Sequence, residues 1–159
     1  MRLSEGEWIC IQSRFDSLSR AVFDSSSLIY IERCELLPVL ERNMTLLTTL
    51  PVIREVGSYP VKLHVIPAAE TEADVSVVRS GAVHNLPVIT EDYGIIRCAR
   101  SYGLVYYNTL MMLCFLLYRR AITIRKYHEF ESRLRMFARY SDAVWQYGAE
   151  IFGRITGRG

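Results

Sequence analysis

Four carboxylic acids stand at positions along the chain where they could serve one reaction. Each follows a short apolar run or lies on the helix-like stretch after one, and the four are Asp24, Glu55, Asp74 and Asp92. Carboxylates within a few ångströms of one another repel, which raises the pKa of at least one of them. Mg²⁺ or Mn²⁺ would remove this repulsion, because hard cations prefer oxygen ligands. One or two such ions can activate a water and orient a phosphodiester, so this acid set favours phosphate chemistry over zinc hydrolysis.

Each acid also has an ordinary structural explanation. An Asp that follows a strand commonly caps a helix or forms a turn. Glu55 could be a solvated surface charge, and Asp74 shares its helix-like stretch with Glu70, as acids favour a first helical turn. Glu91 stands beside Asp92, which leaves the choice between these two open. The hypothesis of an acidic site therefore depends on the whole set.

Apolar, β-prone runs alternate with helix-like runs along most of the chain. Strands are expected at 20–23, 44–49, 61–66, 86–90 and 104–107, and helices at 26–42, 51–57, 68–85, 93–102, 109–120, 124–138 and 141–155. Whether the stretch 26–42 is broken before Pro38 is left open. This alternation predicts an α/β fold with three layers, α/β/α, a mainly parallel sheet of four to five strands and extra C-terminal helices. Sites in such sheets form outside the carboxyl ends of the strands, where Asp24 and Asp92 are expected.

The length of 159 residues suits one domain with a sizeable core. Residues 1–19 fit the alternation poorly and form an N-terminal element of unassigned role. Residues 20–159 are expected to form the α/β domain, with a helical extension from about residue 109. The apolar run 110–118 is about half the roughly 20 residues that span a bilayer, so we expect a core helix or a subunit contact and no membrane association.

The N-terminus and the cysteines point to the cytoplasm. The opening MRLSEGEWIC carries acids where a signal peptide needs a basic and then an apolar stretch. The four cysteines form no CxxC pair, and no His lies at ligand spacing. We therefore expect reduced, mostly buried thiols in a cytoplasmic protein.

Charge is distributed unevenly. Residues 1–115 carry a balance of −3 and residues 116–159 a balance of +5. Cations are needed where acids must approach a phosphate backbone, so an RNA-binding role is predicted for Arg119, Arg120, Arg125 and Lys126. The plainer alternative, favoured for most of these residues taken singly, is a solvated helix surface.

Four segments together resemble the PIN-domain family. They are 23–29 (FDSSSLI), 51–56 (PVIREV), 74–82 (DVSVVRSGA) and 86–92 (LPVITED). In each, an acid of the set stands where the family carries one, and the resemblance runs from about residue 21 to 120. The family's third acid is followed more regularly by Ala than it is here, which makes Glu70 the substitute for Asp74 one turn earlier.

The resemblance implies roles for these residues. Asp24, Glu55, Asp74 and Asp92 would be the catalytic residues and the metal ligands for Mg²⁺ or Mn²⁺, supported by Ser26 and by Glu91. The chain would then be a metal-dependent endoribonuclease acting by a metal-activated water, with one or two ions. Similar small proteins are toxins of toxin–antitoxin pairs, so an antitoxin partner and a homodimer are expected. The alternative is a catalytically inactive PIN scaffold that binds RNA or a protein.

Overall fold

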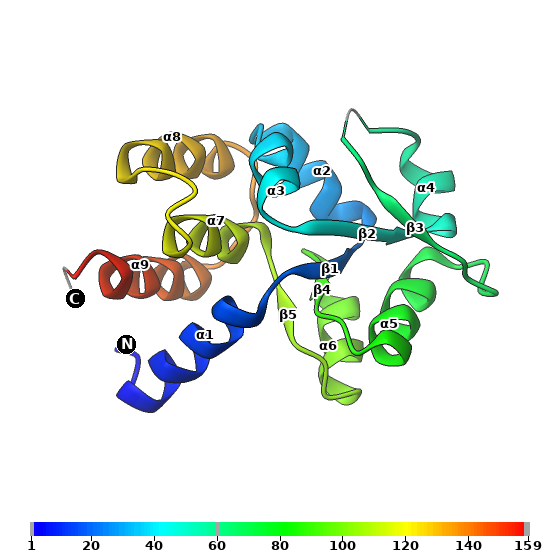
Figure 1. Ribbon diagram of the computed structural model, residues 1–159, viewed down its shortest axis with the longest axis horizontal. Helices are drawn as coiled ribbons and strands as arrows, with labels where there is room; N and C mark the ends of the chain where they lie inside the picture. The colour runs from blue at the N-terminus through cyan, green and yellow to red at the C-terminus, as the bar shows by residue number, and fades with distance from the viewer. Residues whose placement is uncertain (1, 60, 158–159) are drawn as a thin grey trace. The chain divides into compact units, whose positions relative to one another are not determined.

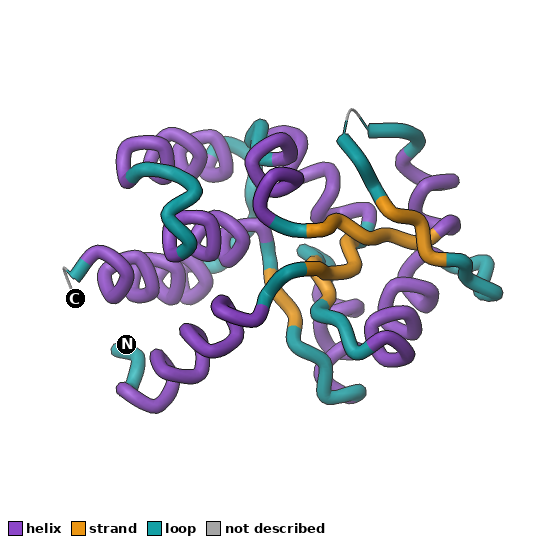
Figure 2. The backbone as a smooth tube through the Cα atoms, viewed as in Figure 1, coloured by secondary structure: helices purple, strands orange, loops and turns teal. Residues whose placement is uncertain are grey.

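Five short parallel strands form one sheet (Figure 2). The structure is a computed structural model and describes residues 2–59 and 61–157. In chain order the strands are β1 (Arg20–Phe23), β2 (Thr45–Thr49), β3 (His64–Ile66), β4 (Val88–Ile89) and β5 (Tyr106–Tyr107). Their order across the sheet is β3-β2-β1-β4-β5, so β1 is central and all of its residues after Arg20 are buried.

Helices cover both faces of this sheet (Figure 1). They are α2 (Ser25–Arg33), α3 (Leu37–Asn43), α4 (Leu50–Val56), α5 (Ala73–His84) and α6 (Tyr93–Ser101). Helices α2 and α3 lie on one face, and α5 and α6 lie on the other. The predicted α/β fold with three layers and a parallel sheet is therefore confirmed.

The chain divides into two compact units. The sheet unit is Ser19–Thr109, and the helical unit joins Met1–Leu18 to Leu110–Gly159. The helical unit contains α1 (Glu5–Ser17), the body of α7 (Thr109–Tyr118), α8 (Ile124–Arg135) and α9 (Asp142–Thr156). The N-terminal residues, which were given no role from the sequence, thus belong with the C-terminal helices.

Helix α1 has a clear start signal. The Ser4 hydroxyl accepts from the Glu7 backbone N–H at 3.2 Å, and the Glu7 carboxylate accepts from the Ser4 N–H at 2.7 Å. This reciprocal capping box satisfies two amide groups that the first turn would otherwise leave unpaired. The buried side chains Trp8, Ile11 and Phe15 lie on one face of the helix.

Aromatic and polar contacts hold α1 to α7. The Phe15 ring lies 5.8 Å from the Phe115 ring, and the Tyr118 hydroxyl donates to Asp16 at 2.8 Å. Every residue from Leu110 to Leu117 is buried. Core packing, the use expected for most of this apolar run, is therefore what the structure gives.

Several element boundaries differ from the prediction. The stretch expected at 26–42 is two helices, with the break before Pro38 that the sequence left open, because Glu35 adopts a left-handed φ of 64° and the Leu36 N–H donates to the Ile31 carbonyl. Pro38 then lies in the first turn of α3, where its missing N–H costs nothing. The outer strands are shorter than expected, and α5 begins at Ala73 instead of 68.

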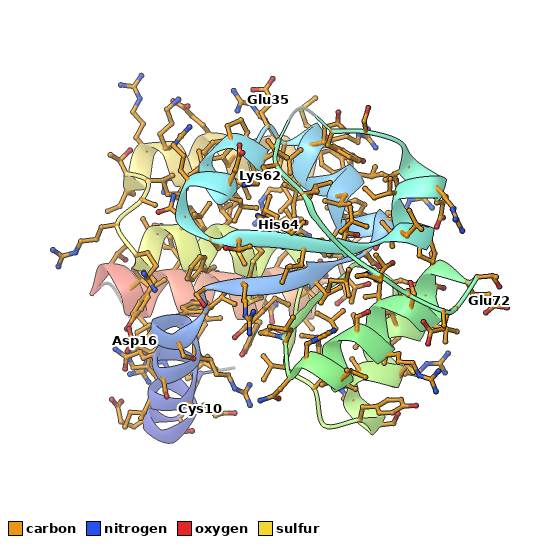
Figure 3. All side chains as sticks on the ribbon, turned by 45° about the vertical axis from the view of Figure 1, so that its right-hand side comes forward. Cys10, Asp16, Glu35, Lys62, His64 and Glu72 are labelled. Carbon is orange, nitrogen blue, oxygen red and sulfur yellow. The ribbon has the colours of Figure 1, made fainter. Side chains whose placement is uncertain are left out.

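Two of the four cysteines are buried, whereas most were expected to be. Cys34 and Cys114 are buried, and burial raises the pKa of the Cys114 thiol to about 12. Cys10 and Cys98 are exposed, so the expectation of mostly buried thiols was wrong for these two (Figure 3 labels Cys10 on α1). Within residues 2–59 and 61–157, no helix combines the length and apolar character that a bilayer crossing requires.

Gly81 allows α5 to lie close against β4. A Cβ added there would sit 2.9 Å from a Val88 methyl carbon and 3.2 Å from the Leu86 carbonyl oxygen. The same glycine's carbonyl accepts from both Asn85 and Leu86, and Asn85 ends the helix at a left-handed φ of 50°. The family resemblance favours Ala in this stretch, but packing leaves no space for a methyl group at this position.

We expect Gly81→Ala to destabilise the protein by about 1–3 kcal/mol, because the methyl overpacks the contact between α5 and β4. The measurement is urea unfolding followed by far-UV circular dichroism. Gly6→Ala is the matched control: a Cβ at Gly6 meets nothing within 4 Å, and this exchange in α1 should stabilise by about 0.4–1 kcal/mol. Equal effects of the two substitutions would contradict the close approach at Gly81.

Candidate active site

Asp24 is a buried carboxylate at the carboxyl end of the central strand, with only 2% of its surface exposed. Its Oδ1 accepts from the Ser27 backbone N–H at 2.8 Å, and so Asp24 is the N-cap of α2. The Ser26 hydroxyl lies 2.9 and 2.8 Å from its two oxygens, and the Thr90 hydroxyl donates to Oδ2 at 2.5 Å. Within the described part of the chain, no cation pairs with this carboxylate.

Burial raises the pKa of Asp24 above the usual Asp range, and the hydrogen bonds from Thr90, Ser27 and Ser26 oppose that rise. Buried charges in proteins are normally paired with an opposite charge or bound to a metal. Here only neutral donors surround the carboxylate. The arrangement therefore leaves a negative site without a compensating charge.

Thr90 joins Asp24 to the second acid. Its side chain is fully buried, donates to Asp24 and accepts from the Asp92 backbone N–H at 3.0 Å. Asp92 is the N-cap of α6, because its Oδ1 accepts from the Ile95 N–H at 3.0 Å. Since β1 and β4 pair directly, Asp24 and Asp92 lie at the same edge of the sheet, as predicted.

Asp74 connects the remaining acids to this edge. Burial is the largest cause of its raised pKa, and the negative charges of Asp92, Glu55 and Glu72 raise the pKa further. These neighbours come from α6, α4 and the residue before α5 (Figure 3 labels Glu72). The structure thus brings together acids from separate elements, and repulsion between like charges contributes to the raised pKa of Asp74.

Glu55 and Ser26 tie the surrounding loops together. The hydroxyl of Ser25, the residue that follows Asp24, donates to the Glu55 carboxylate at 3.0 Å. Ser26, expected as a supporting hydroxyl, contacts Asp24 and also accepts from the Glu91 backbone N–H at 3.0 Å. These bonds link α2 both to α4 and to the end of β4.

Glu91 and Glu70, the two acids that could substitute for a listed one, bind other residues. The Glu91 carboxylate accepts from both the backbone N–H and the hydroxyl of Thr109. Glu70 forms an ion pair with Arg79 at 2.9 Å, which lowers the pKa of the Glu70 carboxyl. Of the acids left open by the sequence, Asp92 is therefore the one that acts on Asp74: after burial, its charge is the next cause of the raised pKa of Asp74.

The four cations predicted to hold RNA belong to the helical unit, and three of them have local partners. Arg125 and Lys126 both contact Glu129 on their own helix, at 3.6 and 2.8 Å. Arg119 reaches the carbonyl oxygens of Phe15 and Asp16 at 3.3 and 3.5 Å. These contacts match the plainer alternative of helix-surface charges, whereas the Arg120 side chain forms no hydrogen bond or ion pair within the described residues.

The acids of the sheet unit fit a hard divalent cation in chemistry and charge. The donors are carboxylate and hydroxyl oxygens, which Mg²⁺ and Mn²⁺ prefer, and among the described residues no Lys or Arg forms an ion pair with Asp24 or Asp74. Among residues 2–59 and 61–157, no three His, Cys, Asp or Glu side chains already stand as close as ligands of one ion. The four predicted ligands are thus neighbours in the fold. Asp24 is buried, whereas Glu55, Asp74 and Asp92 are exposed.

Sequence reasoning missed Thr90 and Ser25 as parts of this arrangement. Thr90 was read only as the last residue of a strand, although its place two residues before Asp92 at a strand end offered the signal. A hydroxyl can both donate and accept, so Thr90 can satisfy a buried carboxylate and a backbone N–H together. Ser25 gave no such signal, because its bond to Glu55 depends on where α4 lies.

The raised pKa of Asp24 predicts a pH-dependent stability difference. The folded state binds this proton more tightly than the unfolded chain, so ionised Asp24 costs stability once the pH rises through its folded pKa. Asp24→Asn lacks this cost and keeps the Ser27 cap. In EDTA, the melting temperature of Asp24→Asn relative to that of the wild type should therefore rise from pH 4 to pH 8. A difference that stays constant with pH would show that the carboxyl titrates normally.

No protein-family model matches this chain, and neither does any curated protein.

Proposed function

We propose that the chain is a Mg²⁺- or Mn²⁺-dependent endoribonuclease of the PIN type, with its active site at the carboxyl edge of the sheet. The observation that carries this proposal is the environment of Asp74, whose pKa is raised by burial and then by the charges of Asp92 and Glu55 from other elements. Buried Asp24 adjoins them through Thr90. Clustering acids costs stability, and a bound cation would offset that cost.

Asp24 and Asp92 are the ligands best supported, with Asp74 and Glu55 completing the set. A bound divalent ion would activate a water for attack on the phosphodiester and stabilise the departing oxygen. The protein's own part is to fix the oxygens: Ser26, Ser27 and Thr90 hold Asp24, and the α6 amide holds Asp92. Asp74 and Glu55 are exposed and so are accessible to a bulky polyanion.

The proposed substrate is RNA, whose phosphates require cations near the acids. Besides the predicted Arg119, Arg120, Arg125 and Lys126, two of the exposed arginines of the sheet unit lie on the helices that carry or follow acids of the set. Arg54 adjoins Glu55 on α4, and Arg97 lies on α6, which Asp92 caps. Neither forms an ion pair within the described part of the chain. An antitoxin partner and a homodimer stay predictions of the family resemblance, and a cytoplasmic location stays a prediction from the N-terminal sequence and the cysteines.

Purified protein should cleave mixed RNA in Mn²⁺, and Asp24→Asn and Asp92→Asn should each slow cleavage by more than about 100-fold, as expected for loss of a ligand. Asn still accepts the capping hydrogen bonds, so both variants should fold. The measurement is the initial rate of cleavage of a fluorescently quenched RNA.

Glu70→Gln is the matched control for this experiment. It also removes one negative charge near the start of α5, but Glu70 is paired with Arg79. We expect its rate to stay within about twofold of the wild type, as is usual for surface changes. Equal rates in wild type, Asp24→Asn and Asp92→Asn would place the activity elsewhere or in a contaminant.

Divalent metal should raise the melting temperature of the wild type. At about 100 times the Kd, a ligand that binds only the folded state stabilises it by about 2.7 kcal/mol, or roughly 5–10 °C here. The check is a thermal-shift titration with MgCl₂ and MnCl₂, with Asp24→Asn expected to respond less. A wild type that shows no shift at millimolar metal would favour the inactive scaffold.

A further inference from the structure

The helical unit contains a pocket of about 450 Å³, within the range of small-molecule sites. The residues that line it come from α1, from the end of α7, from the loop between α7 and α8 with the first residue of α8, and from the end of α9. The lining mixes apolar and aromatic side chains with polar ones: Trp8, Leu117, Tyr118, Ile122, Ile124 and Ile155 with Gln12, Thr123 and Thr156. Two arginines, Arg120 and Arg154, also line it, and among the described residues no carboxylate does. A partly apolar pocket with cations and no acids suits an anion with an apolar body.

The two arginines differ in what they already bind. Arg154 pairs with Glu5 at 2.9 Å and donates to the Leu3 carbonyl at 2.7 Å, so it ties α9 to the start of α1. The Arg120 side chain forms no ion pair or hydrogen bond with any described residue. Arg120 is therefore the cation that remains for a ligand.

The backbone holds Arg120 in an unfavourable conformation. Its φ is 58°, in the left-handed region that glycine adopts at little cost. The Ala121 N–H donates to the Leu116 carbonyl and the Arg120 N–H to the Leu117 carbonyl, so this residue closes α7 at a position where glycine is usual. An arginine at such a position indicates a use for its side chain that offsets the strain.

The loop carrying Arg120 is fixed at both ends. The end of α7 anchors one side, and on the other Thr123 caps α8 by accepting from the Lys126 N–H at 3.1 Å. On the opposite wall, the Trp8 ring meets the Tyr118 ring edge to face at 6.4 Å. The pocket is thus formed before any ligand arrives, which lowers the entropic cost of binding.

We propose that this pocket binds a small organic molecule with an apolar body and one carboxylate, which pairs with Arg120. A carboxylate is preferred to a phosphate because a single unpaired arginine matches one charge with two hydrogen bonds. The apolar side chains would cover the body of the ligand. This site lies in the helical unit and uses none of the acids of the proposed active site.

Decanoate is a suitable probe, with decan-1-ol, decylamine and acetate as matched compounds that lack the charge, reverse it or lack the body. Binding is followed by the fluorescence of Trp8 in full-length protein carrying Trp145→Phe, because Trp8 and Trp145 are the two tryptophans. Decanoate, kept below micelle-forming concentrations, should bind at least tenfold more tightly than the other three compounds.

Arg120→Gly separates a binding role from a structural one. Glycine suits the left-handed φ, so the melting temperature should stay level or rise, while decanoate affinity should fall at least tenfold. Arg120→Lys should retain part of the affinity, and Arg125→Ala, an exposed cation paired with Glu129 outside the pocket, should leave it unchanged. Decanoate binding no tighter than decan-1-ol, or undiminished in Arg120→Gly, would overturn the proposal.

Discussion

The solvation of one buried carboxylate organises the sheet unit. Asp24 ends the central strand with almost no exposed surface, and it receives its hydrogen bonds from neutral groups on two elements. Removing an ionised group from water is costly unless such donors are in place. The start of α2 and the end of β4 must therefore meet at this point, and the parallel pairing of β1 with β4 brings them there.

Helix capping and a role in the site are compatible here, although the sequence presents them as alternatives. Asp24 caps α2 and Asp92 caps α6, each through a single oxygen bonded to a backbone N–H. A capped side chain is held in one rotamer, which preorganises it for any ligand that approaches the sheet edge. The ordinary explanation of each acid thus supplies the rigidity that the functional one requires.

Local patterns in the sequence predicted those features of the fold that are determined by residues close to one another along the chain. The five strands, the parallel sheet and the shared edge of Asp24 and Asp92 followed from alternating apolar runs. A break before Pro38 was an open alternative, but the left-handed turn at Glu35 that causes it could not be located, because no Gly signals it. Thr90 as a bridge and the pairing of Glu70 with Arg79 depend on tertiary placement, which single-sequence patterns do not contain. The capping box of α1 was present in the sequence but was not used.

The helical unit is made from two segments that flank the sheet unit, and this has a consequence for synthesis on the ribosome. Helix α1 is synthesised before the sheet unit, with Trp8, Ile11 and Phe15 destined for burial, but its partners Phe115 and Tyr118 are synthesised after the whole sheet unit. Its apolar face must stay uncovered during that interval, since the contacts that bury it are among the longest in sequence. Nascent chains of this protein therefore expose a short amphipathic helix to chaperones until the C-terminal helices arrive.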